Sequence, residues 1–306
     1  MEGQRVIDFK GQVAIVTGAG NGLGRSHALA LASRGARLVV NDLAGPDGTS
    51  LAAESVADEI RDAGGEAFAH GADVSDMDQV QDMVEHAMDR WKQVDILVNN
   101  AGILRDKSFG KSSLTDFRLV LDVHLMGSVN CSKAVWDIMK AQNYGRIAMT
   151  TSTSGIYGNF GQTNYGAAKM GVLGLMNVLS HEGFKNNIRV NALSPAAGTQ
   201  MTEHLLSEEM YSFLKPETVT PGLLFLVSEH APSRAILSAG GGGYSMTKIV
   251  ETEGIWLPDE EQSPESVSAN WHAITDPAGE RWPDSGSDIL QHFVEKARSA
   301  LGRVPS

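Results

Sequence analysis

Short apolar runs rich in β-branched residues alternate along this chain with longer segments whose apolar residues recur at helical spacing. The short runs are Val13–Thr17, Leu38–Asn41, Ile96–Asn99, Ile147–Thr151 and Val190–Leu193. The helix-length segments are Leu23–Ser33, Ala52–Ala63, Met77–Trp91, Phe117–Lys140 and Tyr165–Phe184. Unbroken apolar strands separated by helices are typical of a parallel sheet covered on both faces. The sequence therefore predicts an α/β fold with a Rossmann-type, doubly wound parallel sheet.

The alternation weakens after Met246, and the remaining segment is interrupted by prolines. Two helices are still expected there, at Pro264–Ile274 and Asp288–Leu301. We therefore expect a single domain over residues 1–245 and a C-terminal extension over residues 246–306. The extension is expected to pack on the same domain or on a partner subunit, and the sequence leaves that choice open.

Charge and composition exclude several classes of protein. The 306 residues carry a formal net charge of −12, which disfavours binding to nucleic acid or to anionic membranes. No apolar stretch approaches the ~20 residues needed to span a bilayer, and Met1–Lys10 lacks the apolar core of a signal peptide. Cys131 is the single cysteine, which fits a reducing compartment. We therefore expect a cytoplasmic protein.

A glycine-rich loop follows the first expected strand and opens the first expected helix, with the sequence TGAGNGLG at residues 17–24. Glycines allow a tight turn there and let backbone N–H groups approach a pyrophosphate, and the helix N-terminus adds a favourable dipole. The strand before the loop and the helix after it favour a dinucleotide site over an ordinary flexible turn. The expected contacts are Gly18, Asn21, Gly22, Leu23 and Gly24.

The second expected strand is followed by Asp42, whose position indicates which dinucleotide binds. A carboxylate there accepts hydrogen bonds from the adenosine ribose hydroxyls and repels a 2′-phosphate, which favours NAD over NADP. The alternative is that Asp42 caps the turn before Leu43. Arg25 and Arg37 are the cations that favour NADP, but Arg25 falls inside a helix and Arg37 at the start of a strand. We therefore expect Asp42 to determine the preference for NAD over NADP.

Two further strand ends are expected at the same crevice. Asp73 and Val74 end the third strand, where a carboxylate can bind an adenine amine. The stretch NNAG at residues 99–102 ends the fourth strand, beside the point where the strand order is expected to reverse. Ligands of open α/β sheets bind in that crevice. The residues Asn100, Ala101 and Gly102 are therefore expected to contact the cofactor.

Three polar residues form the expected catalytic group. Tyr165 and Lys169 lie one turn apart on an expected helix and share a face, and Ser152 follows the fifth strand. Tyrosine titrates near pH 10, so a nearby ammonium together with the positive ring of oxidised nicotinamide would be needed to favour the phenolate. Ser152 would then hold the substrate oxygen while Tyr165 exchanges its proton. Alone, the Tyr–Lys pair is better explained as an ordinary helix pair; the other motifs favour catalysis.

These motifs resemble those of the short-chain dehydrogenase/reductase family over residues 10–240. The resemblance rests on the glycine loop, the NNAG stretch, Ser152, Tyr165 and Lys169. It implies a seven-stranded sheet in the order 3-2-1-4-5-6-7, a homodimer or homotetramer, and hydride transfer between a nicotinamide cofactor and a carbonyl/alcohol pair. It also implies that Tyr165 and Lys169 contact the cofactor, with Lys169 holding the nicotinamide ribose.

The sequence departs from the family pattern at two places. His124 occupies the position of the asparagine that anchors a water of the proton relay. An imidazole also carries protons, so His124 is a candidate for the relay; the alternative is a histidine packed between helices. Pro195-Ala196 replaces the usual Pro-Gly, and Thr199 follows at nearly the place of the threonine that meets the nicotinamide carboxamide.

Four stretches resemble one branch of the family, the (3R)-hydroxyacyl-CoA dehydrogenase units of peroxisomal type-2 multifunctional enzymes, also called type-4 17β-hydroxysteroid dehydrogenases. They are residues 99–109 (NNAGILRDKSF), 144–149 (YGRIAM), 155–165 (GIYGNFGQTNY) and 264–271 (PESVSANW). The resemblance implies oxidation of (3R)-3-hydroxyacyl-CoA. Arg105, Lys107 and Lys111 are candidates to bind the phosphates of CoA, or else form a solvated loop face.

Two alternatives stay open at this point. One is a hydroxysteroid dehydrogenase acting on free steroid alcohols, and the other is a non-catalytic NAD-binding sensor. A metal-dependent enzyme is not expected, because the nine histidines and the cysteine show no His-x-x-x-His or Cys-x-x-Cys spacing. Acyl-chain length and the choice between dimer and tetramer are not encoded in any motif.

Overall fold

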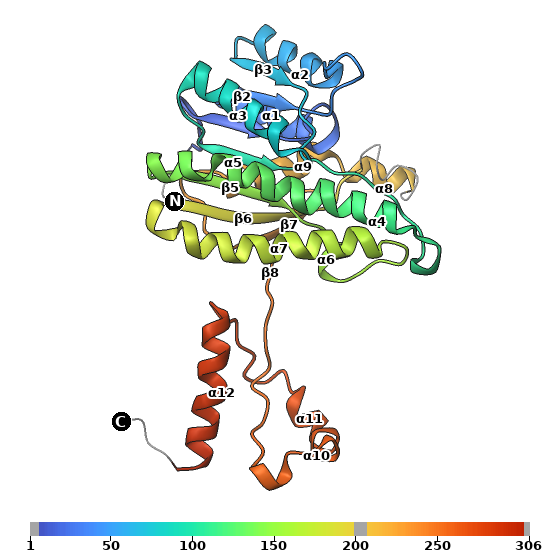
Figure 1. Ribbon diagram of the computed structural model, residues 1–306, viewed down its shortest axis with the longest axis vertical. Helices are drawn as coiled ribbons and strands as arrows, with labels where there is room; N and C mark the ends of the chain where they lie inside the picture. The colour runs from blue at the N-terminus through green and yellow to red at the C-terminus, as the bar shows by residue number, and fades with distance from the viewer. Residues whose placement is uncertain (1–5, 199–206, 303–306) are drawn as a thin grey trace. The chain divides into compact units, whose positions relative to one another are not determined.

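Eight strands form one sheet in the order β3-β2-β1-β4-β5-β6-β7-β8 (Figure 1). The computed structural model describes residues 6–198 and 207–302. The strands are β1 (Val13–Val16), β2 (Arg37–Asn41), β3 (Ala67–His70), β4 (Ile96–Asn99), β5 (Gly145–Thr150), β6 (Ile188–Pro195), β7 (Ile236–Gly240) and β8 (Gly243–Thr247). Neighbouring strands from β3 to β7 pair in parallel, which confirms the predicted α/β fold. The chain order reverses at β1, which lies between β2 and β4.

The sheet has one strand more than the seven that the family resemblance implied. β8 follows β7 after a turn at Gly241 and Gly242, whose φ angles are +56° and +80°. Glycine adopts such angles without steric cost, so the chain can reverse in two residues and add an edge strand. The Tyr244 hydroxyl donates to the backbone oxygen of Thr218 (2.7 Å), which holds the added strand to a helix.

Helices cover both faces of the sheet. They are α1 (Gly22–Ser33), α2 (Leu51–Asp62), α3 (Met77–Trp91), α4 (Leu114–Leu121), α5 (Gly127–Gln142), α6 (Thr153–Ile156), α7 (Thr163–Gly183), α8 (Glu208–Phe213) and α9 (Pro216–Leu226). Buried residues of α1, α2 and α9 form one core with the sheet, and those of α3, α5 and α7 form the other. In the described ranges no helix combines the length and the apolar character needed to cross a membrane.

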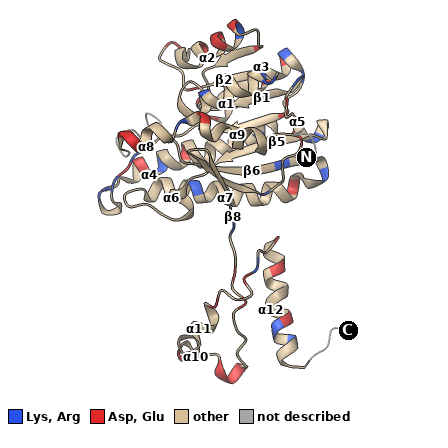
Figure 2. Cartoon of the chain, turned by 180° about the vertical axis from the view of Figure 1, so that it is seen from behind, with Lys and Arg blue, Asp and Glu red and all other residues tan. Residues whose placement is uncertain are grey.

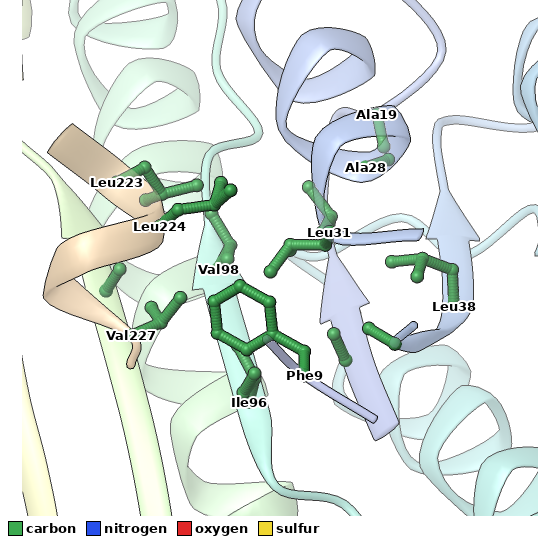
Figure 3. Close-up of a cluster of buried hydrophobic side chains, with 14 of the residues drawn as sticks. Phe9, Ala19, Ala28, Leu31, Leu38, Ile96, Val98, Leu223, Leu224 and Val227 are labelled. Atoms are coloured by element: carbon green, nitrogen blue, oxygen red, sulfur yellow. The ribbon is translucent and has the colours of Figure 1, made fainter. Parts of the chain in front are cut away.

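The first of these cores contains the aromatic ring of Phe9, which is 1% exposed. Figure 3 shows this ring beside Ile96 and Val98 of β4, with Leu223 and Val227 near it from the α9 end. Burial of one such side chain contributes about 1.5–3 kcal/mol, before the entropy of ordering it is subtracted. The packing fixes the end of the sheet opposite the glycine loop.

The segment predicted as one helix at Phe117–Lys140 is divided in the structure. A π-helical stretch, Asp122–Met126, separates α4 from α5. Such stretches insert one extra residue into a helix and often occur at functional sites. His124, at its centre, is buried as a result.

The chain divides into two compact units, Met1–Met246 and Thr247–Ser306. The second unit contains α10 (Pro264–Ala269), α11 (Trp271–Ile274) and α12 (Gly286–Ala300), close to the two helices expected from the sequence. Within it, Glu251 and Arg281 form an antiparallel bridge, and Lys296 pairs with Glu253. How this unit packs on a domain or on a partner stays a prediction.

Candidate active site

The glycine loop is pressed against the end of β4, so its glycines leave no room for side chains. A Cβ atom on Gly18 would lie 2.7 Å from Ala101 Cα, and one on Gly24 would lie 2.1 Å from the Gly18 oxygen. Gly18 and Gly22 also have positive φ angles, +61° and +53°. These contacts are closer than real Cβ atoms tolerate, so the loop keeps its backbone exposed on the ligand side.

The first turn of α1 offers its backbone N–H groups to an anion. Asn21, the N-cap residue, has an extended backbone, and within the described part of the chain its side chain does not cap the helix. The first turn also contains no acidic residue. Uncapped N–H groups and the helix dipole together favour a phosphate. The residues present therefore fit the pyrophosphate of a dinucleotide.

Asp42 lies beside this loop and is bonded to it. Its Oδ2 accepts a hydrogen bond from Gly20 N (2.7 Å), and its Oδ1 accepts one from Leu43 N (2.8 Å). Both interpretations from the sequence therefore have a structural counterpart: the carboxylate caps the turn at Leu43 and also lies at the glycine loop.

The two cations that would favour NADP are engaged elsewhere. Arg25 pairs with Glu59 of α2, a helix whose acidic residues are red in Figure 2. Arg37 donates to the Gly11 oxygen (2.7 Å), at the end of β2 away from Asp42. Of the three charged side chains, those of Asp42, Arg25 and Arg37, that of Asp42 is the one that bonds to the glycine loop.

Thr17 joins the two strands that flank the reversal point, and sequence reasoning did not single it out. Its Oγ1 accepts hydrogen bonds from Asn100 N (3.0 Å) and Ala101 N (3.1 Å). Asn100 Nδ2 in turn donates to the Thr17 and Gly18 oxygens (2.9 and 3.0 Å). Asn100 and Ala101 therefore lie against the glycine loop, as expected. A threonine just before the first glycine was the available signal.

Asp73 and Val74 lie in the loop between β3 and α3 and do not end the third strand as expected, because β3 ends at His70. Asp73 Oδ1 accepts hydrogen bonds from the backbone N–H and the hydroxyl of Ser75 (2.9 and 2.7 Å), so it shapes its own turn. Val74 is buried, and its side chain lies against Gly127 of α5. Thr199, the third outlying cofactor residue expected from the sequence, lies outside the described residues.

Ser152, Tyr165 and Lys169 meet at the carboxyl end of β5. Ser152 lies close enough to Tyr165 to lower the pKa of the Tyr165 hydroxyl. Lys169 is buried, its Nζ donates to the Thr150 oxygen (2.6 Å), and it lies 5.6 Å from the centre of the Tyr165 ring. The structure therefore brings together the three residues that the sequence grouped.

Burial dominates the protonation of this group. Desolvation raises the pKa of Tyr165, and the charge of Asp106 adds to this rise. Ser152 lowers the pKa of Tyr165, but by less than desolvation raises it. Desolvation also lowers the pKa of Lys169 to about 7, so only part of the lysine is charged at neutral pH. The protein groups raise rather than lower the pKa of Tyr165, and the expected phenolate requires a further positive charge.

His124 packs edge-on against the Tyr165 ring, with the ring centres 5.1 Å apart and the planes at 84°. Its Nε2 lies 2.8 Å from the Ile103 oxygen and 3.0 Å from Ile103 N. Burial, together with the charge of Lys169, lowers the pKa of His124 to about 3, so the ring is neutral at neutral pH. Ile103, whose backbone meets this ring, was not expected from the sequence. The position thus combines both sequence interpretations, because the ring is packed and still lies beside the catalytic group.

The side-chain amides of two residues near Tyr165 join neighbouring segments, and the sequence did not predict this role for them. Gln162 accepts from the Ser154 hydroxyl (2.7 Å) and donates to Asp106 (2.7 Å). Asn164 Nδ2 donates to the Arg105 oxygen (3.1 Å). These bonds fasten the segment after α6 to the segment after β4. Single amide residues in a loop carry no distinguishing sequence pattern.

The three cations proposed for CoA phosphates are exposed and differ in their engagement. Lys107 Nζ pairs with Asp116 (3.4 Å), and Arg105 Nη1 donates to the Leu104 oxygen (2.8 Å). Lys111 ends a short 3-10 turn at Phe109–Lys111.

Known proteins similar to this chain indicate its family. The chain is 46% identical over 296 residues to peroxisomal multifunctional enzyme type 2 of Mus musculus; the match covers 94% of this chain and 40% of that protein. The solved full-length peroxisomal multifunctional enzyme type 2 of Drosophila melanogaster matches with a TM-score of 0.81 and 39% identity, over 94% of this chain and 50% of that one. The chain therefore spans about half or less of these relatives.

A third match is a solved 7α-hydroxysteroid dehydrogenase in complex with NADH and 7-oxo glycochenodeoxycholic acid. It has a TM-score of 0.70 and 30% identity, and the match covers 77% of this chain and 95% of that one. Residues 12–210 match the short chain dehydrogenase family, a span that contains the glycine loop, Ser152, Tyr165 and Lys169. This chain therefore belongs to the short-chain dehydrogenase family and is an oxidoreductase acting on CH–OH groups.

Proposed function

We propose that this protein is an NAD-dependent (3R)-3-hydroxyacyl-CoA dehydrogenase that forms 3-oxoacyl-CoA in the β-oxidation of fatty acids or steroid side chains. The observation that carries the proposal is the meeting of Ser152, Tyr165 and Lys169 after β5, in the same sheet whose strand β1 leads into the glycine loop and the uncapped N-terminus of α1. The substrate class is supported by the likeness to the multifunctional enzymes of mouse and fly.

In this proposal, Tyr165 takes the proton of the substrate hydroxyl, while Ser152 holds the same oxygen by a hydrogen bond. The bound nicotinamide ring supplies the hydride acceptor and the positive charge that stabilises the phenolate. Lys169 donates to the Thr150 oxygen from a buried position and would hold the nicotinamide ribose when the cofactor is bound. His124 acts as a positioning residue, since its neutral ring packs on Tyr165 and is bonded to Ile103.

The cofactor contacts that we propose come from segments that follow strands β1 to β6 in the sequence. They are Gly18, Asn21, Gly22, Leu23, Gly24, Asp42, Asp73, Val74, Asn100, Ala101, Gly102, Tyr165, Lys169 and Thr199. The preference for NAD over NADP rests on Asp42, which keeps a carboxylate at the loop, and on the engagement of Arg25 by Glu59.

The test is turnover of NAD with (3R)-3-hydroxyacyl-CoA, followed by NADH absorbance, in the wild type and in Tyr165→Phe. Loss of the proton acceptor should lower kcat by about 10²–10⁴-fold. Tyr244→Phe, which removes a hydroxyl on β8 away from the site, is the matched control and should retain the wild-type rate. Full activity of Tyr165→Phe would refute the assignment.

A second candidate is a 17β-hydroxysteroid dehydrogenase acting on free steroid alcohols, favoured by the likeness to the steroid-bound 7α-hydroxysteroid dehydrogenase. The values of kcat/KM for an acyl-CoA and for a free steroid, measured side by side, separate the two. Cofactor binding without turnover on a broad panel of alcohols would instead support the non-catalytic sensor.

Assembly and compartment complete the proposal. We expect a homodimer or homotetramer in which residues 246–306 pack on the domain or on a partner, and light scattering of the whole chain measures its state. The cytoplasmic location expected from the sequence competes with the peroxisomal location named for the mouse and fly relatives. Cell fractionation decides between them.

A further inference from the structure

We propose that His70, Asp82 and His86 bind a divalent transition metal of the zinc class. His70 ends β3, the edge strand of the sheet, and Asp82 and His86 lie one turn apart on α3. One ligand atom from each of the three residues lies within 4.8 Å of the others. The site is separate from the catalytic group and does not depend on the proposed function.

Two of the three separations between ligand atoms match what zinc requires, and the third is within 4.8 Å. His70 Nε2 lies 3.0 Å from Asp82 Oδ2, and His86 Nδ1 lies 3.5 Å from the same oxygen. Zinc binds imidazole nitrogens and carboxylate oxygens at about 2.0–2.2 Å, so neighbouring ligands of a tetrahedral site are about 3.3 Å apart. Both measured separations lie close to this value. A metal can therefore enter with small side-chain rotations.

The donor set points to the same class of metal. Two imidazoles and one carboxylate suit zinc, cobalt, nickel and copper, whereas magnesium and calcium prefer oxygen ligands. The His86 Nδ1 atom donates to the Asp82 backbone oxygen (2.8 Å), and coordination would replace that hydrogen bond. The competing interpretation is a plain hydrogen-bonded pair between His70 and Asp82.

The site also has an open position. His70 and Asp82 line a surface hollow of about 390 Å³, together with Ser50 and Glu54. The side chain of His70 is 15% exposed and that of Asp82 is 59% exposed, so the metal is reached from solvent while one ligand is held in the protein. A water molecule from the hollow supplies a fourth ligand, as in zinc sites with three protein ligands.

These three ligands have no His-x-x-x-His or Cys-x-x-Cys spacing, because a helix presents Asp-x-x-x-His and a strand supplies the second histidine. Metal binding would join the edge strand β3 to α3 near its middle. We therefore expect the metal to stabilise the native state, because the unfolded chain does not hold the three ligands together.

The test uses the whole chain with any polyhistidine tag removed, stripped with a chelator and titrated with Zn²⁺ by calorimetry. We expect one high-affinity ion per chain, a rise in Tm with Zn²⁺, and a tetrahedral absorption spectrum with Co²⁺. His70→Gln, Asp82→Asn and His86→Gln should each weaken binding about tenfold or more. His181→Gln, an exposed histidine on α7, is the matched control and should bind like the wild type.

Two results would overturn the proposal. One is wild-type Zn²⁺ affinity in both His70→Gln and His86→Gln, which would place any bound zinc elsewhere. The other is no Zn²⁺ binding by the wild type up to millimolar concentration, which would leave the plain His70–Asp82 hydrogen bond. Circular dichroism of the metal-free variants checks that each one folds, and Asp82→Asn provides the third, independent ligand removal.

Discussion

The imidazole of His124 fills the space that any side chain at position 102 would need. A Cβ atom on Gly102 would lie 2.2 Å from His124 Cε1, and 2.9 and 3.1 Å from the two ring nitrogens. Because the His124 ring also packs on the Tyr165 ring, a displacement of His124 would disturb the position of Tyr165. The glycine that ends the NNAG stretch is therefore coupled to the replacement of asparagine by histidine.

This coupling predicts the outcome of Gly102→Ala. The methyl group forces the His124 ring out of place, so kcat should fall by about 10²-fold, since small misplacements of catalytic groups cost this much. The double variant Gly102→Ala/His124→Asn should recover a large part of the loss, because asparagine has no atom where Cε1 lies. Steady-state kinetics of both variants test this; a double variant no better than the single one would contradict the coupling.

Asp42→Ala tests the cofactor preference. Removing the carboxylate deletes the acceptor for Gly20 N and the charge that repels a 2′-phosphate. The kcat/KM for NAD should fall about tenfold or more, and the ratio of NADP to NAD usage should rise. Asp47→Ala, which removes a nearby acidic turn residue bonded to Thr49 N, is the control and should change neither value. An unchanged NADP/NAD ratio in Asp42→Ala would remove the argument for NAD.

Lys169→Met should produce a protein that is more stable than the wild type and catalytically inactive. Burial lowers the pKa of Lys169 from near 10.5 in the unfolded chain to about 7 in the native state. Folding therefore disfavours the charged ammonium form of this lysine. After the loss of the hydrogen bond to Thr150 O, the net gain in unfolding free energy at pH 7 should be about 1–3 kcal/mol. The unfolded state binds more protons between pH 7 and 10.5, so the wild type gains stability as pH rises there.

The sign of that pH dependence gives the measurement. Urea unfolding of both proteins at pH 6.5, 7.5 and 8.5 should show the stability difference shrinking as pH rises. A constant difference would mean that the lysine is not desolvated, whatever its effect on turnover.

His27→Gln should make the protein less sensitive to acid. His27 is buried between α1 and α9, where its Nδ1 lies 2.8 Å from Thr220 Oγ1, and burial lowers its pKa to about 3. The unfolded state therefore takes up a proton between pH 6.5 and 3 that the native state does not, and stability falls as pH falls through this window. Each such histidine contributes at most about 1.4 kcal/mol per pH unit.

Chemical denaturation at pH 7 and pH 5 tests the role of His27. At pH 7 the free energy of unfolding of the variant should be lower than that of the wild type, because Thr220 loses its imidazole partner. On acidification to pH 5 the variant should lose less of its stability than the wild type. The histidine on the surface of α7, His181, provides the control as His181→Gln. An equal acid-induced loss in His27→Gln and the wild type would contradict the assignment.

The apolar alternation alone predicted a doubly wound parallel sheet, whereas the order of its first seven strands was implied by the family resemblance and is confirmed. Tyr165 and Lys169 share a helix, so their proximity follows from spacing alone. The hydrogen bonds of Thr17 to residues after β4 and the bond of Gln162 to Asp106 link segments that are distant in sequence. The threonine before the first glycine was a signal for the former, whereas no local pattern indicated the latter. The pKa of Tyr165 was also beyond the sequence, because burial outweighs its neighbours.

The hydroxyl of Thr17 makes three hydrogen bonds across the reversal point of the sheet, two from the residues after β4 and one to the Val98 oxygen (3.3 Å). These hydrogen bonds fix the distance between the carboxyl ends of β1 and β4 in the folded chain. The conformational entropy needed to shape this side of the crevice is lost once, when the chain folds, and not again each time a ligand binds.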